Sequence, residues 1–86
     1  MEKRLGSIAI VITDKESIVD VNQLLSSSSD IIIARQGLPI PQRDVSFISL
    51  VVDGTTDAIN KLTGKLGRLP GVEVKTIVTK NSNQEL

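Results

Sequence analysis

The sequence predicts an α+β fold, a two-layer sandwich in which two helices cover one face of a four-stranded antiparallel sheet in the order βαββαβ. Ile, Val and Leu supply nearly all apolar residues and Phe47 is the only aromatic one, and β-branched residues favour strands. Two segments with helical periodicity alternate with four apolar stretches of strand length. At 86 residues the chain has room for one domain. We expect that domain to span residues 1–80, followed by a flexible tail at 81–86.

Two different periodicities indicate the first strand and the first helix. Residues 5–13 alternate large isoleucines with smaller side chains, which is the period of a strand. Apolar residues then recur at helical spacing as far as the serines at 26–29. Thr13 or Asp14 can cap this helix, because both side chains accept hydrogen bonds from the first N–H groups of a helix. Asp14 is also a candidate ligand or interface residue at this junction.

The second strand, residues 30–36, is short and apolar on both faces. We expect Gly37, Pro39 and Pro41 to end it, because proline lacks the N–H donor of the ladder and fixes φ. The stretch that begins at Arg35 is then either an extended connector between two strands or a loop that contacts a ligand or partner. Arg35, Gly37 and Pro39 are therefore candidate site residues.

The second half of the chain repeats the strand–helix–strand pattern. Residues 45–52 form the third strand, and Thr55 or Thr56 caps an amphipathic helix that Pro70 ends. Residues 72–79 form the last strand. Right-handed connections in both strand–helix–strand units place the two helices on the same face of the sheet. This is the ferredoxin-like arrangement.

Two glycines interrupt the second helix, Gly64 and Gly67. Each costs about 1 kcal/mol of helix stability relative to alanine. Both lie beside the apolar stripe of the helix rather than on it. They permit close approach of another backbone or of a ligand, or else Gly67 marks the fraying end of the helix. Both are candidate ligand or interface residues.

The sheet face that the helices leave uncovered should be polar in a monomer, yet both alternations of the first and third strands are apolar. An exposed patch of this kind exceeds what a monomer normally tolerates. We therefore expect burial against another copy, most simply across a twofold axis; the alternative is scattered surface valines. The predicted oligomer face consists of Ala9, Val11, Ile32, Val45, Phe47 and Val51.

Composition excludes several classes of function. Lys plus Arg balance Asp plus Glu, so we expect no direct binding of nucleic acid. Cysteine and histidine are absent, which removes thiolate chemistry, the commonest metal ligand and the usual general base. We expect no enzyme activity, no metal site and no cofactor. No apolar run approaches the roughly 20 residues of a membrane span, so we expect no membrane contact and a cytoplasmic location.

The chain resembles the family of small proteins named iron-only hydrogenase system regulators. This resemblance implies an ACT-like fold similar to the C-terminal regulatory domain of nickel-responsive repressors, and oligomers built through sheet surfaces. The nickel site of those repressors is not implied, because this chain has neither histidine nor cysteine. The second-helix stretch 62–67 is the most specific part. The matching segments are 10–12 with Asp14, 21–25, 30–32 with Arg35, Gly37 and Pro39, 62–67, Gly71 with Val72, and 74–76.

Two hypotheses for function follow. The first is a non-enzymatic regulatory module of a hydrogenase system, a homodimer or homotetramer that holds a small-molecule effector. The alternative is a protein-interaction or assembly factor for hydrogenase maturation that binds a hydrogenase-system protein and no small ligand.

Overall fold

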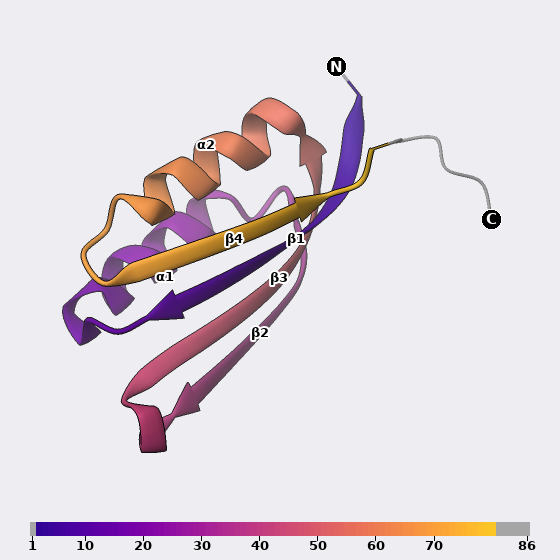
Figure 1. Cartoon of the computed structure of the whole chain (residues 1–86). Helices are drawn as coiled ribbons and strands as arrows, with labels where there is room; N and C mark the ends of the chain where they lie inside the picture. Colours follow the sequence, from indigo (N-terminus) through magenta and orange to yellow (C-terminus); the bar gives the residue numbers. More distant parts are fainter. Residues whose placement is uncertain (1, 81–86) are drawn as a thin grey trace.

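The computed structural model of this chain describes residues 2–80. The predicted tail at 81–86 lies outside the described residues. The elements follow the predicted order, with two short 3-10 turns, η1 and η2, added to it (Figure 1). Their bounds are β1 Lys3–Ile12, η1 Lys15–Ser17, α1 Ile18–Ser27, β2 Ile32–Ile40, η2 Pro41–Arg43, β3 Val45–Thr55, α2 Thr56–Gly67 and β4 Val72–Val78.

The strands form an antiparallel sheet in the order β2-β3-β1-β4. Both helices lie against the same face of this sheet (Figure 1). Partners across the ladder share a face, and Ile8 of β1 lies opposite Leu50 of β3, both fully buried. The even-numbered residues of β1 and β3 therefore face the helices, and the odd-numbered residues form the other side, which we call the outer face. The predicted ferredoxin-like fold is confirmed.

The core lies between the sheet and the helices. Alternation in the strands and the helical spacing of apolar residues in the helices place the apolar side chains of both layers here. The buried apolar residues are Ile8, Ile10, Ile12, Val21, Leu25, Ile31, Ile48, Leu50, Val52, Ile59, Leu62 and Leu66.

Two connections at the helix ends are fixed by particular residues. Thr55, the last residue of β3, caps α2, because its Oγ1 accepts a hydrogen bond from the N–H of Ala58 at 3.1 Å. After α2, Gly71 adopts a left-handed φ of 66°. Its carbonyl oxygen accepts hydrogen bonds from the N–H and the hydroxyl of Thr13, at 2.8 and 3.1 Å. The start of β4 is thereby tied to the end of β1.

The predicted end of the second strand is wrong. β2 continues through Gly37 and Pro39 to Ile40, and the turn η2 begins at Pro41. β2 is an edge strand that pairs only with β3 in the described chain. An edge strand tolerates proline because one side of it makes no ladder. The stretch after Arg35 is therefore strand rather than loop.

The predicted place of Ile32 on the oligomer face is also wrong. Ile32 lies opposite Val52, which is fully buried, and packs against the core. A β-bulge follows it: Ile33 is the extra residue, and Ala34 lies opposite Val51. Because Ile33 has no partner of its own, even-numbered Ile32 faces the helices before the bulge, and odd-numbered residues of β2 face them after it. Ala34 thus belongs to the outer face, and Ile32 to the helix-facing side.

Candidate functional site

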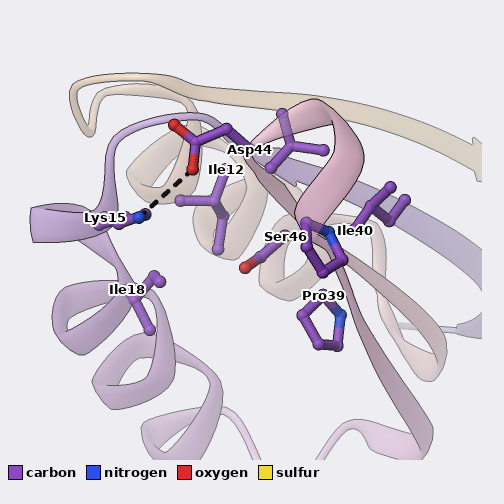
Figure 2. A pocket seen from close by; sticks show the side chains of 9 residues that line it. Ile12, Lys15, Ile18, Pro39, Ile40, Asp44 and Ser46 are labelled. Atoms are coloured by element: carbon purple, nitrogen blue, oxygen red, sulfur yellow. Dashed lines mark ion pairs between the residues drawn. The ribbon is translucent and has the colours of Figure 1, made fainter.

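An open cavity of about 430 Å³ lies at one end of the sheet, between the start of α1 and the β2–β3 connection (Figure 2). β1 and β2 end here and β3 begins here, so the cavity collects side chains from these three strands, from α1 and from the turns η1 and η2. The lining residues are Ile12, Lys15, Ile18, Pro39, Ile40, Pro41, Asp44, Val45 and Ser46.

The floor of the cavity is a row of side chains across three strands. Pro39 of β2 lies opposite Ser46 of β3, and Ser46 lies opposite Ile12 of β1. All three belong to the helix-facing side. Ile18 is the first residue of α1 and joins them from the helix layer (Figure 2). The floor is therefore apolar, with the Ser46 hydroxyl as its polar group.

The turn between β1 and α1 brings Lys15 to the mouth of the cavity. Asp14 is extended, with φ −104° and ψ 111°, and its Oδ1 accepts a hydrogen bond from the N–H of Glu16 at 3.0 Å. This is the capping interaction predicted for Asp14. It starts η1 immediately after the strand, and Lys15 is the first residue of that turn.

The turn between β2 and β3 brings Asp44 to the same mouth. Pro41 starts η2, where its fixed φ suits a helical turn and its missing N–H leaves no donor unsatisfied. Asp44 ends the turn with a left-handed φ of 54°, and its N–H donates to the carbonyl of Pro41 at 3.2 Å. Aspartate is one of the few non-glycine residues that adopt this conformation readily.

Lys15 and Asp44 form an ion pair across the mouth, with Nζ and Oδ1 3.3 Å apart (Figure 2). The two side chains are 80% and 77% exposed. An ion pair this exposed contributes at most about 1 kcal/mol to stability. The arrangement presents an ammonium and a carboxylate, each able to exchange its partner, above an apolar floor. It can hold a small molecule that has an apolar body and a charged group.

The predicted ligand candidates do not form one site. Pro39 lines the cavity, and Asp14 lies just before Lys15 and caps η1. Arg35 and Gly37 precede Pro39 on the helix-facing side of β2. The Arg35 guanidinium donates through Nη2 to Oδ1 of Asn22 in α1. Arg35 thus bridges the edge strand to the helix layer rather than lining the cavity.

Gly64 and Gly67 lie elsewhere, beside β4 at the opposite edge of the sheet. They line a separate groove between α2 and β4 together with Asn60 and Thr63. A Cβ atom on either glycine would contact nothing within 4 Å. Gly67 is also the last residue of α2, in keeping with the interpretation that it marks the end of the helix.

The sequence did not single out Lys15, Asp44 or Ser46. The contact between Lys15 and Asp44 joins two turns that are distant in the chain, so no local sequence pattern predicts it. The available signal was the aspartate that follows Pro41-Gln42-Arg43, because aspartate is frequent where a turn requires a positive φ.

The outer face carries the remaining predicted residues. Ala9, Val11, Val45, Phe47 and Val51 all lie on it, in the odd-numbered positions of β1 and β3. Five large apolar side chains on this face are exposed, Phe47 and Val51 being 36% and 42% accessible. The other three are Leu5 in β1, Leu38, which lies opposite Phe47 in β2, and Ile77 in β4.

Metal and membrane features are not found in the part of the chain that the structure describes. Residues 2–80 contain no group of three or more His, Cys, Asp or Glu side chains placed to hold a metal ion. None of the helices within these residues is long and apolar enough to cross a membrane.

Comparison with known proteins identifies the family. A family model named TM1266-like and described as "Iron-only hydrogenase system regulator, putative" matches residues 4–76. The chain belongs to this family. The chain is also similar to the solved structure of TM1266 from Thermotoga maritima, at 38% identity and a TM-score of 0.88 over 92% of this chain and 100% of that one. A search of curated proteins found no match.

More distant structures share the fold of this chain. The C-terminal domain of the MgtC protein from Mycobacterium tuberculosis has 13% identity and a TM-score of 0.69, over 95% of this chain and 94% of that one. A protein described as a "putative glycine cleavage system transcriptional repressor" has 16% identity and a TM-score of 0.68, over 98% of this chain and 50% of that one. These matches agree with the predicted ACT-like fold.

Proposed function

We propose that this member of the family is a non-enzymatic, homo-oligomeric regulatory module of an iron-only hydrogenase system, and that a small-molecule effector binds in the cavity between Lys15 and Asp44. The observation that carries the proposal is the exposed ion pair over an apolar floor. The pair adds little stability, so its position at the mouth of a cavity suits recognition of a ligand better than support of the fold.

The chemistry of the lining defines the effector class. Ile12, Ile18 and Pro39 suit a compact apolar body, and the Ser46 hydroxyl can donate or accept a hydrogen bond. A ligand carboxylate would take Asp44's place beside Lys15, and a ligand ammonium would take Lys15's place beside Asp44. The effector is therefore a small, partly apolar molecule that carries a charge of either sign.

Support for a non-enzymatic role comes from the same residues. The sequence has no histidine and no cysteine, and the Asp14 carboxylate accepts a hydrogen bond from the backbone as a cap. The charged side chains at the cavity mouth are paired with each other and exposed, which is unlike the desolvated setting that tunes a general base.

Thermal unfolding in the presence of amino acids, carboxylates, amines and nucleotides tests the proposal. We expect one class to raise Tm, because a ligand that binds only the folded state stabilises it. Lys15→Gln and Asp44→Asn should remove that shift, and Asn is chosen because it tolerates the positive φ. Lys61→Gln, an exposed lysine on α2, is the matched control and should keep the shift. No shift with any class would contradict an effector site.

The exposed apolar residues of the outer face support a second candidate function. The same surface that favours self-association would also suit a hydrogenase-system protein, and the chain would then act as an assembly factor. A stoichiometric complex with such a protein, formed without any small ligand and lost in Val51→Asp, would favour this alternative.

A further inference from the structure

The two edges of the sheet differ in how they are protected. β2 and β4 are the edge strands of the described chain. β2 contains the bulge at Ile33 and a proline, Pro39, which has no N–H to donate. Both devices prevent an edge from pairing with another strand. β4, Val72–Val78, contains neither of them.

Hydrogen bonds to β1 show which backbone groups of β4 face outward. The N–H of Thr79 donates to the carbonyl of Leu5 at 2.9 Å, and the N–H of Thr13 donates to the carbonyl of Gly71 at 2.8 Å. Backbone groups alternate along an antiparallel strand, so odd-numbered residues of β4 bond to β1. The N–H and C=O groups of Val74 and Thr76 therefore point away from the sheet.

Space beside this edge is open. The groove between α2 and β4 has a volume of about 560 Å³. Gly64 and Gly67 bear no side chain and have nothing within 4 Å of the position a Cβ would take. Neither glycine therefore places a side chain in the path of a strand that is added beside β4.

We propose that β4 pairs with β4 of a second copy of this chain, antiparallel and across a twofold axis that passes by Val74. Outer-face charges select this register. Glu73 then lies directly opposite Lys75 of the second copy, and Lys75 lies opposite the second Glu73. An axis at Lys75 would instead place Lys75 opposite Lys75 of the second copy. An axis at Thr76 would place Lys75 opposite Ile77 of the second copy. Opposite charges directly across a ladder are favourable and like charges are not.

The proposed pairing is self-consistent in its hydrogen bonds. Val74 lies opposite the second Val74, and Val72 lies opposite the second Thr76. All of these are even-numbered residues, whose carbonyl groups face outward. Glu73 and Lys75 then form the non-hydrogen-bonded pairs, in which side chains lie closest. The result is one continuous sheet through both copies. The pairing uses the backbone edge of β4 and neither the exposed apolar side chains of the outer face nor the Lys15–Asp44 cavity, so the proposal goes beyond the proposed function.

Disulfide trapping tests the register directly, because the chain has no cysteine. Cα atoms of a non-hydrogen-bonded pair are about 4.5 Å apart, within the range that a disulfide spans. An equimolar mixture of Glu73→Cys and Lys75→Cys should oxidise to a cross-linked dimer at least about tenfold faster than either variant alone. The mixed dimer keeps one Lys75–Glu73 pair intact. Glu73→Cys mixed with Ile77→Cys, which would meet if the axis lay at Lys75, is the control and should stay slow.

Charge reversal provides a second test, made in a Val51→Asp background so that the outer face does not contribute. Glu73→Lys or Lys75→Glu alone should weaken dimerisation by roughly tenfold or more, because each creates two like-charge pairs. An equal mixture of the two, and the double variant, should restore it. Both positions are exposed, so folding should be unaffected.

The results separate this proposal from the proposed function. Any of four results would overturn the β4 pairing. The Val51→Asp chain could be monomeric, or the charge reversals could leave dimerisation unchanged. The mixture of Glu73→Lys and Lys75→Glu could fail to dimerise, or the Glu73→Cys and Lys75→Cys mixture could cross-link no faster than its control. An effector-induced rise of Tm would remain untouched by all of these outcomes, because neither Glu73 nor Lys75 lines the effector cavity.

Discussion

The Ser17 hydroxyl donates a hydrogen bond to the carbonyl oxygen of Pro70 at 2.6 Å. Ser17 directly precedes α1, and Pro70 lies in the turn between α2 and β4, so this bond joins the connections of both helices at one end of the molecule. Ser17 is a buried polar residue, 3% exposed.

Ser17→Ala should lower the free energy of unfolding by about 1 kcal/mol, the net value of one intramolecular hydrogen bond. Urea unfolding measures this change. Ser26→Ala, at an exposed position of α1, is the control and should stay within about 0.5 kcal/mol of the wild type. Equal effects of the two substitutions would show that the Ser17–Pro70 bond does not stabilise the fold.

Alanine at two glycine positions should have effects of opposite sign. Gly71 has a left-handed φ of 66°, and a Cβ there would lie 2.6 Å from Cβ and 2.8 Å from the backbone nitrogen of Asp14. Gly71→Ala should therefore destabilise by at least about 2 kcal/mol, from the strained φ and the clash together.

Gly64 is the matched control for Gly71, because it lies within α2 and a Cβ would meet nothing within 4 Å. Gly64→Ala should raise the free energy of unfolding by up to about 1 kcal/mol through helix propensity. Thermal or chemical unfolding measures the free energy of unfolding of both variants. Destabilisation by both substitutions would contradict the open position of Gly64.

Thr55 and Thr56 are adjacent threonines with different roles at the start of α2. Thr55 Oγ1 accepts the hydrogen bond from Ala58, whereas Thr56 is the first residue of the helix. Thr55→Ala should cost about 1 kcal/mol as the loss of a cap. Thr56→Ala should change stability by less than about half of that, since alanine is favoured inside a helix. A reversed order would mean that the helix begins one residue later.

The outer face should control self-association independently of folding. Val51→Asp places a charge on the outer face, which also carries the exposed Phe47, and an oligomer formed through that face would lose its affinity. Val19→Asp is the control, because Val19 is 62% exposed on α1. Sedimentation velocity should show a smaller species for Val51→Asp than for Val19→Asp. A wild-type chain that sediments as single molecules would remove the case for this interface.

Periodicity was sufficient to predict the layers of this fold. The isoleucines at 8, 10 and 12 alternate in the first strand, and Ile59, Leu62 and Leu66 recur at helical spacing in the second helix. Both patterns are buried against each other as expected. Periodicity predicts the buried face here because each of these elements packs against the opposite layer with one definite face.

β2 was harder to predict for two physical reasons. It is an edge strand, so residues that end a central strand, such as Pro39, can remain within it. Its first residues, Ile31, Ile32, Ile33 and Ala34, are all apolar, so no alternation shows where the bulge falls.

The cavity was largely hidden from the sequence. Pro39 was identified through its backbone chemistry, but Lys15 and Asp44 meet only because two turns close at the same end of the sheet. Their contact depends on a left-handed aspartate and on the register of β2 against β3, and both are properties of the folded chain.

The single extra residue at Ile33 sets the side-chain positions in two different surfaces, the effector cavity and the outer face. If β2 kept Ile33 but paired with β3 without the bulge, every later side chain of β2 would turn to the opposite side of the sheet. The Arg35 guanidinium would leave Asn22 and lie beside Val51 and Phe47, and the Pro39 ring would withdraw from the cavity floor. Loss of the bulge would therefore alter the effector cavity and the outer face together, whereas deletion of the unpaired Ile33 would leave Ile32 opposite Val52 and Ala34 opposite Val51.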